Sequence, residues 1–108
     1  MIAIPVECED ENNFTSNEFV NAQYFAFIDL SKTEILKNDN KDEKEISNWL
    51  KSKNVDIVIT PYIGENTFNF LKENEIKAYL EKKKDEIYNT LLKYADGELP
   101  ILDESYYK

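Results

Sequence analysis

Residues 55–80 read VDIVITPYIGENTFNFLKENEIKAYL, a pattern that is typical of a strand, a short helix and a second strand. The first part, Val55 to Thr60, is a nearly unbroken apolar run rich in β-branched residues, as expected of an inner strand covered on both faces. Glu65 to Glu73 carries apolar side chains at helical spacing, and Ile76 to Leu80 returns as a strand. The stretch therefore predicts a βαβ unit with a right-handed crossover.

Three more strands and two more helices are predicted from the same two periodicities. The strands are residues 2–6, 23–30 and 33–37, and the helices are residues 43–53 and 85–95. We place the first strand beside residues 55–60 in parallel, and the next two form a hairpin that turns at Ser31 and Lys32. The order β-β-β-α-β-α-β-α predicts an α/β fold, a five-stranded mixed sheet with helices on both faces.

The composition indicates one domain over residues 1–108, because a chain of this length can bury one core but not two. The hydrophobic content of 42% supplies that core. The sequence has no apolar run of membrane length, no basic leader and a single cysteine, so we expect a cytoplasmic protein with no membrane partner. The net charge of −9 repels phosphate backbones, and no nucleic-acid partner is expected.

Two irregular segments stand out in this order of elements. Glu7 to Asn21 is acidic and lacks apolar periodicity, so it is predicted to be a long, exposed and mobile loop of the kind that is often functional. Pro100 to Lys108 carries apolar and aromatic side chains suited to packing on the domain or on a second copy. A monomer or a weak homodimer is therefore expected.

Two residues near strand ends are candidates for binding, and each has a structural alternative. The chain has no histidine, which removes the commonest metal ligand and general base. Cys8 follows the first strand, where its thiolate could hold a soft metal; alternatively it is an unreactive thiol, since Glu7 and Glu9 disfavour the thiolate. Gly64 precedes a helix, so its amide could face an anion; alternatively it is a plain turn glycine.

Several short motifs follow one another along nearly the whole chain. They are IAIP in the first strand, Ser-x-x-Phe at the end of the loop, Tyr24-Phe25-x-x-x-Asp29, Val55-Asp56-Ile57-Val58-Ile59, Ile63-Gly64 with Phe68, Ile76-Lys77-x-Tyr79 and Gly97-Glu98-Leu99. Their order and spacing resemble the dinitrogenase iron-molybdenum cofactor-binding family, which includes nitrogenase accessory proteins. The resemblance implies a three-layer, ribonuclease-H-like fold. Two glycines that are usual in the family are Asn54 and Glu75 here, changes that concern turns.

The same resemblance implies a function and a binding loop. Family members are small carriers of an iron-molybdenum or other metal–sulfur cluster, with a cluster donor or acceptor protein as partner. Their loop typically reads Ser-x-His-Phe-Gly-Arg, whereas residues 16–21 read SNEFVN, so Glu18 replaces the His and Asn21 the Arg. Together with the candidates near the strand ends, the resemblance gives a predicted set of cofactor-binding residues: Cys8, Ser16, Glu18, Asn21, Tyr62 and Gly64. The predicted metal ligand is Cys8.

We expect the loop after the first strand and the turn at residues 62–65 to meet, because both leave the carboxyl ends of neighbouring parallel strands. Three functions remain open at this point. The first is the cluster carrier, and the second is a non-catalytic interaction module that uses the acidic loop or the aromatic tail. The third is a nuclease with Glu7, Asp29 and Asp56 as metal-binding carboxylates. The negative charge would repel its substrate, so no enzyme and no catalytic residues are expected.

Overall fold

The elements of the chain follow the predicted order. The computed structural model describes residues 1–10, 13–30 and 32–108. The elements are β1 (Ile2–Val6), β2 (Tyr24–Asp29), β3 (Lys32–Lys37), α1 (Glu43–Ser52), β4 (Ile57–Thr60), α2 (Glu65–Glu73), β5 (Lys77–Leu80), α3 (Ile87–Ala95) and a 3₁₀ turn, η1 (Glu104–Tyr107). Ser31, predicted to lie in the hairpin turn, is outside the described residues.

The strands form one five-stranded mixed sheet in the order β3-β2-β1-β4-β5. β1 pairs antiparallel with β2 and parallel with β4, and β4 pairs parallel with β5. β4 thus has a strand on each side, as its apolar run predicts. Val58 in its middle is fully buried, and the next residue, Ile59, is 1% exposed. The predicted fold class and the interior position of this strand are both confirmed.

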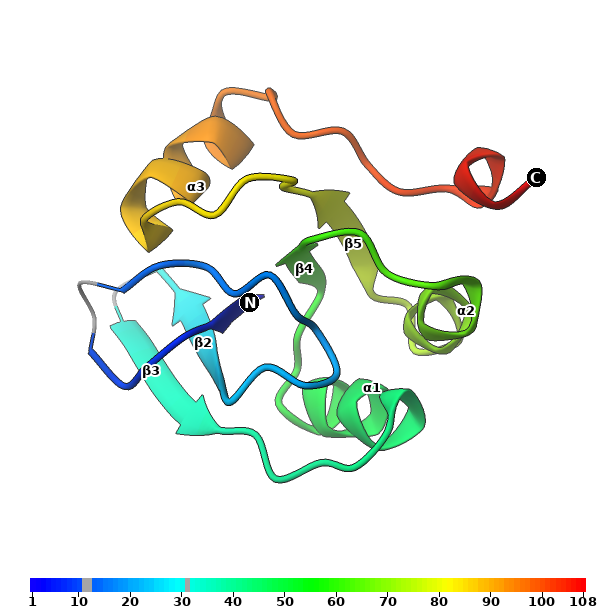
Figure 1. The fold of residues 1–108 in the computed structure, drawn as a ribbon, viewed down its shortest axis with the longest axis horizontal. Helices are drawn as coiled ribbons and strands as arrows, with labels where there is room; N and C mark the ends of the chain where they lie inside the picture. Colours follow the sequence, from blue (N-terminus) through cyan, green and yellow to red (C-terminus); the bar gives the residue numbers. More distant parts are fainter. Residues whose placement is uncertain (11–12, 31) are drawn as a thin grey trace.

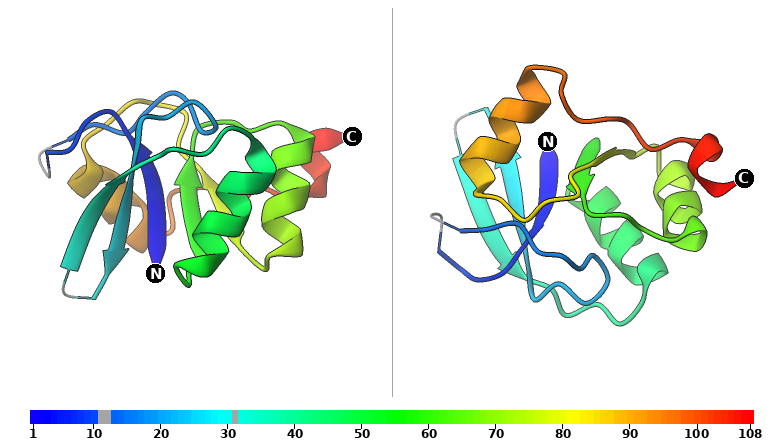
Figure 2. Two further views of the ribbon diagram at one scale, coloured as in Figure 1. Left: turned by 90° about the horizontal axis from the view of Figure 1, so that it is seen from below. Right: turned by 45° about the horizontal axis from the view of Figure 1, so that its top comes forward.

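Helices cover both faces of the sheet and make three layers (Figures 1 and 2). α1 and α2 lie next to each other on one face, and α3 lies on the other. Successive residues of β4 point to opposite faces, so Val58 belongs to the core cluster under α1 and α2, and Ile59 belongs to the cluster under α3. In the described part of the chain, no helix combines the length and the apolar character that crossing a membrane requires.

Among the described residues, three turns place a residue in the left-handed region of backbone conformation. Asn54 follows α1 with a φ of 64°, Glu75 follows α2 with 60°, and Gly97 follows α3 with 74°. Asn tolerates this conformation and glycine adopts it freely, so the first and last positions suit their residues. Glu75 has no such advantage, and its backbone is strained at this position.

Residues 98–108, which we call the C-terminal strap, pack on the domain itself. The Leu80 amide donates to the Pro100 carbonyl at 2.8 Å, and the Leu102 amide donates to the Ala78 carbonyl at 2.8 Å. The strap thus runs along the open side of β5 and then reaches α2 through η1 (Figure 1). Of the two arrangements that the sequence left open for the tail, packing on its own domain is the one observed.

Candidate functional site

The carboxyl ends of three neighbouring parallel strands meet at one edge of the sheet. β1 ends at Val6, β4 at Thr60 and β5 at Leu80. Three connections leave this edge, and we call them the edge loop (residues 7–23), the β4–α2 turn (residues 61–64) and the β5–α3 linker (residues 81–86). Open α/β sheets bind their ligands at this edge, so the candidate site is built from these three connections.

The middle of the edge loop is hydrogen-bonded to the β5–α3 linker. The Thr15 amide donates to the Asp85 carbonyl at 2.8 Å, and the Asp85 amide donates to the Thr15 hydroxyl at 3.1 Å. The Ile87 amide donates to the Asn13 carbonyl at 3.0 Å, and the side chains of Asn13 and Thr15 are buried. The prediction of an exposed loop over residues 7–21 is therefore wrong for Asn13 and Thr15, because backbone hydrogen bonds bury them without any apolar periodicity. Residues 11–12 of this segment lie outside the described residues, and the mobility of the loop stays a prediction.

The last part of the edge loop is anchored on the opposite face of the sheet. Phe19 is 5% exposed and packs edge-on against Phe25, with ring centroids 5.4 Å apart. The Asn38 side-chain amide donates to the carbonyls of Val20 and Ala22 at 3.1 and 2.8 Å. The edge loop thus crosses the edge of the sheet, from the α3 side at residues 13–15 to the side of α1 and α2 at Phe19.

Three charged side chains hold the β5–α3 linker in place. The Lys93 ammonium group pairs with Glu81 and lies 3.1 Å from an Asp85 carboxylate oxygen. The pKa of Asp85 is held below its ordinary value, first by the Asn89 side chain, then by Lys93 and the Glu86 amide, all of which donate hydrogen bonds to it. The pKa of Lys93 is raised, mainly by its bond to Glu81. This cluster fixes the segment to which Thr15 is bonded.

Asp85→Asn is expected to lower the free energy of unfolding by about 1 kcal/mol at neutral pH, because it removes one of the two carboxylates that pair with Lys93. The folded pKa of Asp85 lies below the unfolded value of 3.8, so its contribution is present above that pH and is lost as the pH falls through the folded pKa. The free energies of unfolding of parent and variant, measured in urea, should therefore converge at acid pH. Asp39→Asn, at an exposed position, is the control. A constant difference down to the lowest pH would contradict this role.

Ser16 and Asn21 line the same small hollow. Its volume is about 230 Å³, and its walls come from the end of β1 and from the edge loop, namely Val6, Glu7, Ser16 and residues 21–23. The Ser16 hydroxyl accepts a hydrogen bond from the Glu18 amide at 3.0 Å, which orders the turn at Glu18. The side chains of Glu18 and Asn21 are exposed. Ser16 and Glu18 thus share one turn, and Asn21 lies in the next, which the hydrogen bond from the Ala22 amide to the Phe19 carbonyl closes at 3.3 Å.

Cys8 does not line this hollow. It is an exposed free thiol, and its carbonyl accepts a hydrogen bond from the Asn13 side chain. The adjacent Glu9 accepts a hydrogen bond from the Tyr24 hydroxyl at 3.0 Å, and this bond raises the pKa of Tyr24. Among the described residues, no group of three or more Cys, Asp and Glu side chains is arranged to hold a metal ion. Cys8 can supply one soft ligand but not a complete coordination shell.

The β4–α2 turn presents the start of a helix to solvent. Gly64 is the N-cap of α2 and has no side chain to accept the first helical amides, so these N–H groups remain available to an anion. Its φ of −72° does not require glycine, and a Cβ atom built there would have nothing within 4 Å. Tyr62 beside it is 58% exposed. At the end of β4, the Thr60 hydroxyl is buried without a hydrogen-bond partner.

The edge loop and the β4–α2 turn lie on the same side of the sheet, since Phe19 and Ile63 belong to one core cluster. The carboxylates around them oppose an anion. Glu7, Glu18 and Glu65 are exposed at this edge, although Glu7 pairs with the Lys84 ammonium group at 2.6 Å. Sequence patterns gave no signal for the buried Thr60 hydroxyl or for the Asp85 cluster, because each depends on residues distant in the chain.

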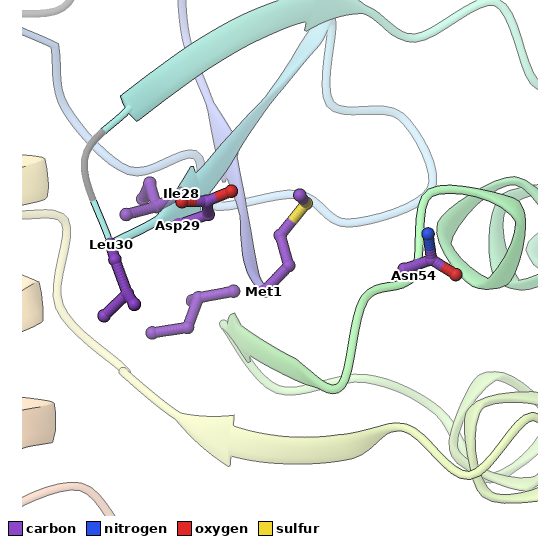
Figure 3. A pocket seen from close by; sticks show the side chains of 6 residues that line it. Met1, Ile28, Asp29, Leu30 and Asn54 are labelled. Atoms are coloured by element: carbon purple, nitrogen blue, oxygen red, sulfur yellow. The ribbon is translucent and has the colours of Figure 1, made fainter.

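A second hollow lies at the opposite edge of the sheet (Figure 3). Its volume is about 550 Å³, and the side chains of Met1, Ile2, Ile28 and Leu30 give it mainly apolar walls. Leu30 is fully exposed at the end of the β2–β3 hairpin. The described residues of its lining include Asp29 but none of the six predicted cofactor-binding residues and no cationic or thiol side chain, so we do not place cluster binding there.

The fold and this edge define a small three-layer α/β protein that presents a loop and an uncapped helix start at the carboxyl ends of its parallel strands. Residues 1–97 match the model of the dinitrogenase iron-molybdenum cofactor family, and the chain belongs to this family. The family resemblance seen in the sequence is confirmed. This membership relates the chain to proteins associated with the iron-molybdenum cofactor of dinitrogenase.

Solved structures have the same fold. A NifB-like protein from Thermotoga is 25% identical, with a TM-score of 0.80, and the match covers 94% of this chain and 91% of that one. The apo form of the orange protein from Desulfovibrio gigas has a TM-score of 0.84 at 17% identity, covering 94% and 91%. A dinitrogenase-like protein from Methanocaldococcus jannaschii has a TM-score of 0.72 at 20% identity, covering 94% and 93%. A comparison with curated proteins finds no match.

Proposed function

We propose that this protein is a non-catalytic carrier or accessory protein that binds an iron-molybdenum or related metal–sulfur cluster during cofactor biosynthesis. The observation that carries the proposal is the family match over residues 1–97. The cargo would come from a donor protein and pass to an acceptor protein, in the cytoplasm, with the carrier acting as a monomer or a weak homodimer. The packing of the strap on its own domain favours the monomer.

The cargo would bind at the carboxyl edge, between the edge loop and the β4–α2 turn. Metal–sulfur clusters of this kind are anions, and the N–H groups after Gly64 supply partial positive charge, an effect of about 0.3 to 1 kcal/mol at a helix start. The Ser16 hydroxyl and the Asn21 amide add hydrogen-bond donors, and the Tyr62 hydroxyl adds another. Cys8 offers one thiolate for direct ligation.

Exposed carboxylates at the same edge oppose this binding. Each of Glu9, Glu18 and Glu65 repels an anionic cargo by an amount comparable to what the helix start contributes. The positions of the family's usual His and Arg carry Glu18 and Asn21, so neither a ligand nor a cation compensates. Affinity for an anionic cluster should therefore be weak at neutral pH, which suits a protein that hands its cargo on.

A second candidate function is an interaction module on the same fold that binds no cluster. The acidic side chains of the edge loop favour it, because they suit a basic protein partner better than an anionic cargo. The two candidate functions predict different metal and sulfide contents for the purified protein, and different binding of a metal–sulfur probe.

Because the expected affinity is weak, protein purified without oxygen is expected to retain at most a substoichiometric amount of iron or molybdenum with acid-labile sulfide, as measured by elemental and sulfide analysis. Apoprotein titrated with tetrathiomolybdate should change the visible absorption spectrum of this probe. In Cys8→Ser, the spectral change should lose the component caused by thiolate ligation while the fold stays intact, because Cys8 is exposed. Protein free of metal and sulfide that leaves the spectrum of the probe unchanged would favour the interaction module.

A further inference from the structure

The C-terminal strap contacts the β4–α2 turn through the Tyr107 side chain, and the strap lies outside the family match, which ends at residue 97. The Tyr107 hydroxyl donates a hydrogen bond to the Ile63 carbonyl at 2.9 Å. The two residues are 44 positions apart in the sequence. Ile63 is 4% exposed, so the oxygen of this peptide depends on a protein donor more than on water.

This carbonyl belongs to the same peptide unit as the Gly64 amide. A trans peptide is planar, and its C=O and N–H bonds point in opposite directions. A hydroxyl that fixes the Ile63 carbonyl therefore also fixes the direction of the Gly64 N–H bond, away from Tyr107. On the Gly64 side, nothing lies within 4 Å of where a Cβ atom would be, so the space next to this residue is open.

The Tyr107 ring is held firmly enough to do this. It packs against Phe68 of α2 with ring centroids 5.0 Å apart, and against Tyr62 with centroids 5.9 Å apart. Leu102 anchors the strap in the core at 3% exposure, and Glu104 pairs with Lys72 of α2. Burial raises the pKa of Tyr107 to about 12, so its hydroxyl stays protonated at physiological pH and can donate this hydrogen bond.

We propose that Tyr107 is a positioning residue for the candidate site: its hydrogen bond to the Ile63 carbonyl aims the Gly64 amide and the start of α2 at the space where an anionic cargo binds. The inference rests on the proposed function for the identity of the cargo. The positioning itself depends only on the contacts of the strap. The strap thus orders the start of α2 through this one hydrogen bond.

The test compares Tyr107→Phe with Tyr106→Phe. Both side chains lie on η1, and Tyr106 is 39% exposed, so the second variant removes a hydroxyl from the same turn without touching the Ile63 carbonyl. Two readouts are measured on each protein, the amide resonance of Gly64 by ¹H–¹⁵N NMR and the dissociation constant for tetrathiomolybdate. Tyr107→Phe should shift the Gly64 resonance and weaken binding about fivefold, the effect of one lost hydrogen bond. Tyr106→Phe should match the parent in both.

The two readouts separate this inference from the proposed function. A parent that does not bind the probe while its Gly64 resonance still depends on the Tyr107 hydroxyl would overturn the cargo and support the positioning. A Gly64 resonance that is unchanged in Tyr107→Phe would overturn the positioning, whether or not the parent binds the probe. A shifted Gly64 resonance with an unchanged dissociation constant for a parent that binds the probe would show that Tyr107 orders the turn without affecting binding. That result would also overturn the proposed positioning role.

Discussion

Val58→Asp is expected to unfold the domain. Val58 is fully buried in β4, between β1 and β5, and its side chain lies in the core cluster under α1 and α2. A carboxylate there would have neither water nor a cation, and burying it uncompensated costs several kcal/mol. Domains of this size have about 5 to 15 kcal/mol of stability in total. We expect a loss of more than about 4 kcal/mol, measured by urea unfolding followed by circular dichroism.

Lys77→Asp is the matched control, because it places the same side chain on the neighbouring strand at an exposed position. Lys77 pairs with Ile57 in the register of β5 on β4. Its free energy of unfolding should stay within about 0.5 kcal/mol of the parent value, as for other surface changes. A Val58→Asp variant that unfolds at the urea concentration of the parent would show that β4 is not the covered inner strand of the sheet.

The fold could be predicted because its determinants are local. The apolar run of β4 indicates a strand covered on both faces, and an apolar face with period 3.6 indicates each helix. Asn54, which follows α1 with a φ of 64°, is a residue type that tolerates the left-handed conformation. Patterns of this kind require no knowledge of what the distant parts of the chain do, which is why the order of elements and the sheet were correct.

The candidate site could be predicted only in part, because its order depends on contacts that are distant in sequence. The hydrogen bond between the Asp85 amide and the Thr15 hydroxyl joins residues that are 70 positions apart in the sequence. The hydrogen bond between the Tyr107 hydroxyl and the Ile63 carbonyl joins residues that are 44 positions apart. Both involve backbone groups, which every residue carries, so composition gives no hint of them. The resemblance supplied Ser16 and Asn21, which line one hollow; the binding roles of the six predicted residues remain predictions.

The double change Glu18→His and Asn21→Arg is expected to tighten binding of tetrathiomolybdate about tenfold. It alters the local charge by about two units, since one carboxylate is removed and one guanidinium is added. At exposed positions each such change is worth about 0.5 to 1 kcal/mol, and the sum corresponds to roughly a factor of ten. Both side chains are exposed, so the fold should be unaffected. The dissociation constants of parent and variant, measured by absorption titration, give the comparison.

A control with the same chemistry separates a local effect from a change in total charge. Glu73→His with Asn69→Arg introduces the same residue types at exposed positions on α2, at its carboxyl end and its middle, more than one helical turn from Gly64. Net charge changes equally in both double variants, so a general electrostatic attraction would strengthen binding in both. If the cargo binds at the carboxyl edge, only the variant with Glu18→His and Asn21→Arg should bind tetrathiomolybdate more tightly than the parent. Tight binding by the parent, or an equal gain in the control, would mean that these loop positions do not govern the affinity and that the cargo binds elsewhere on the protein.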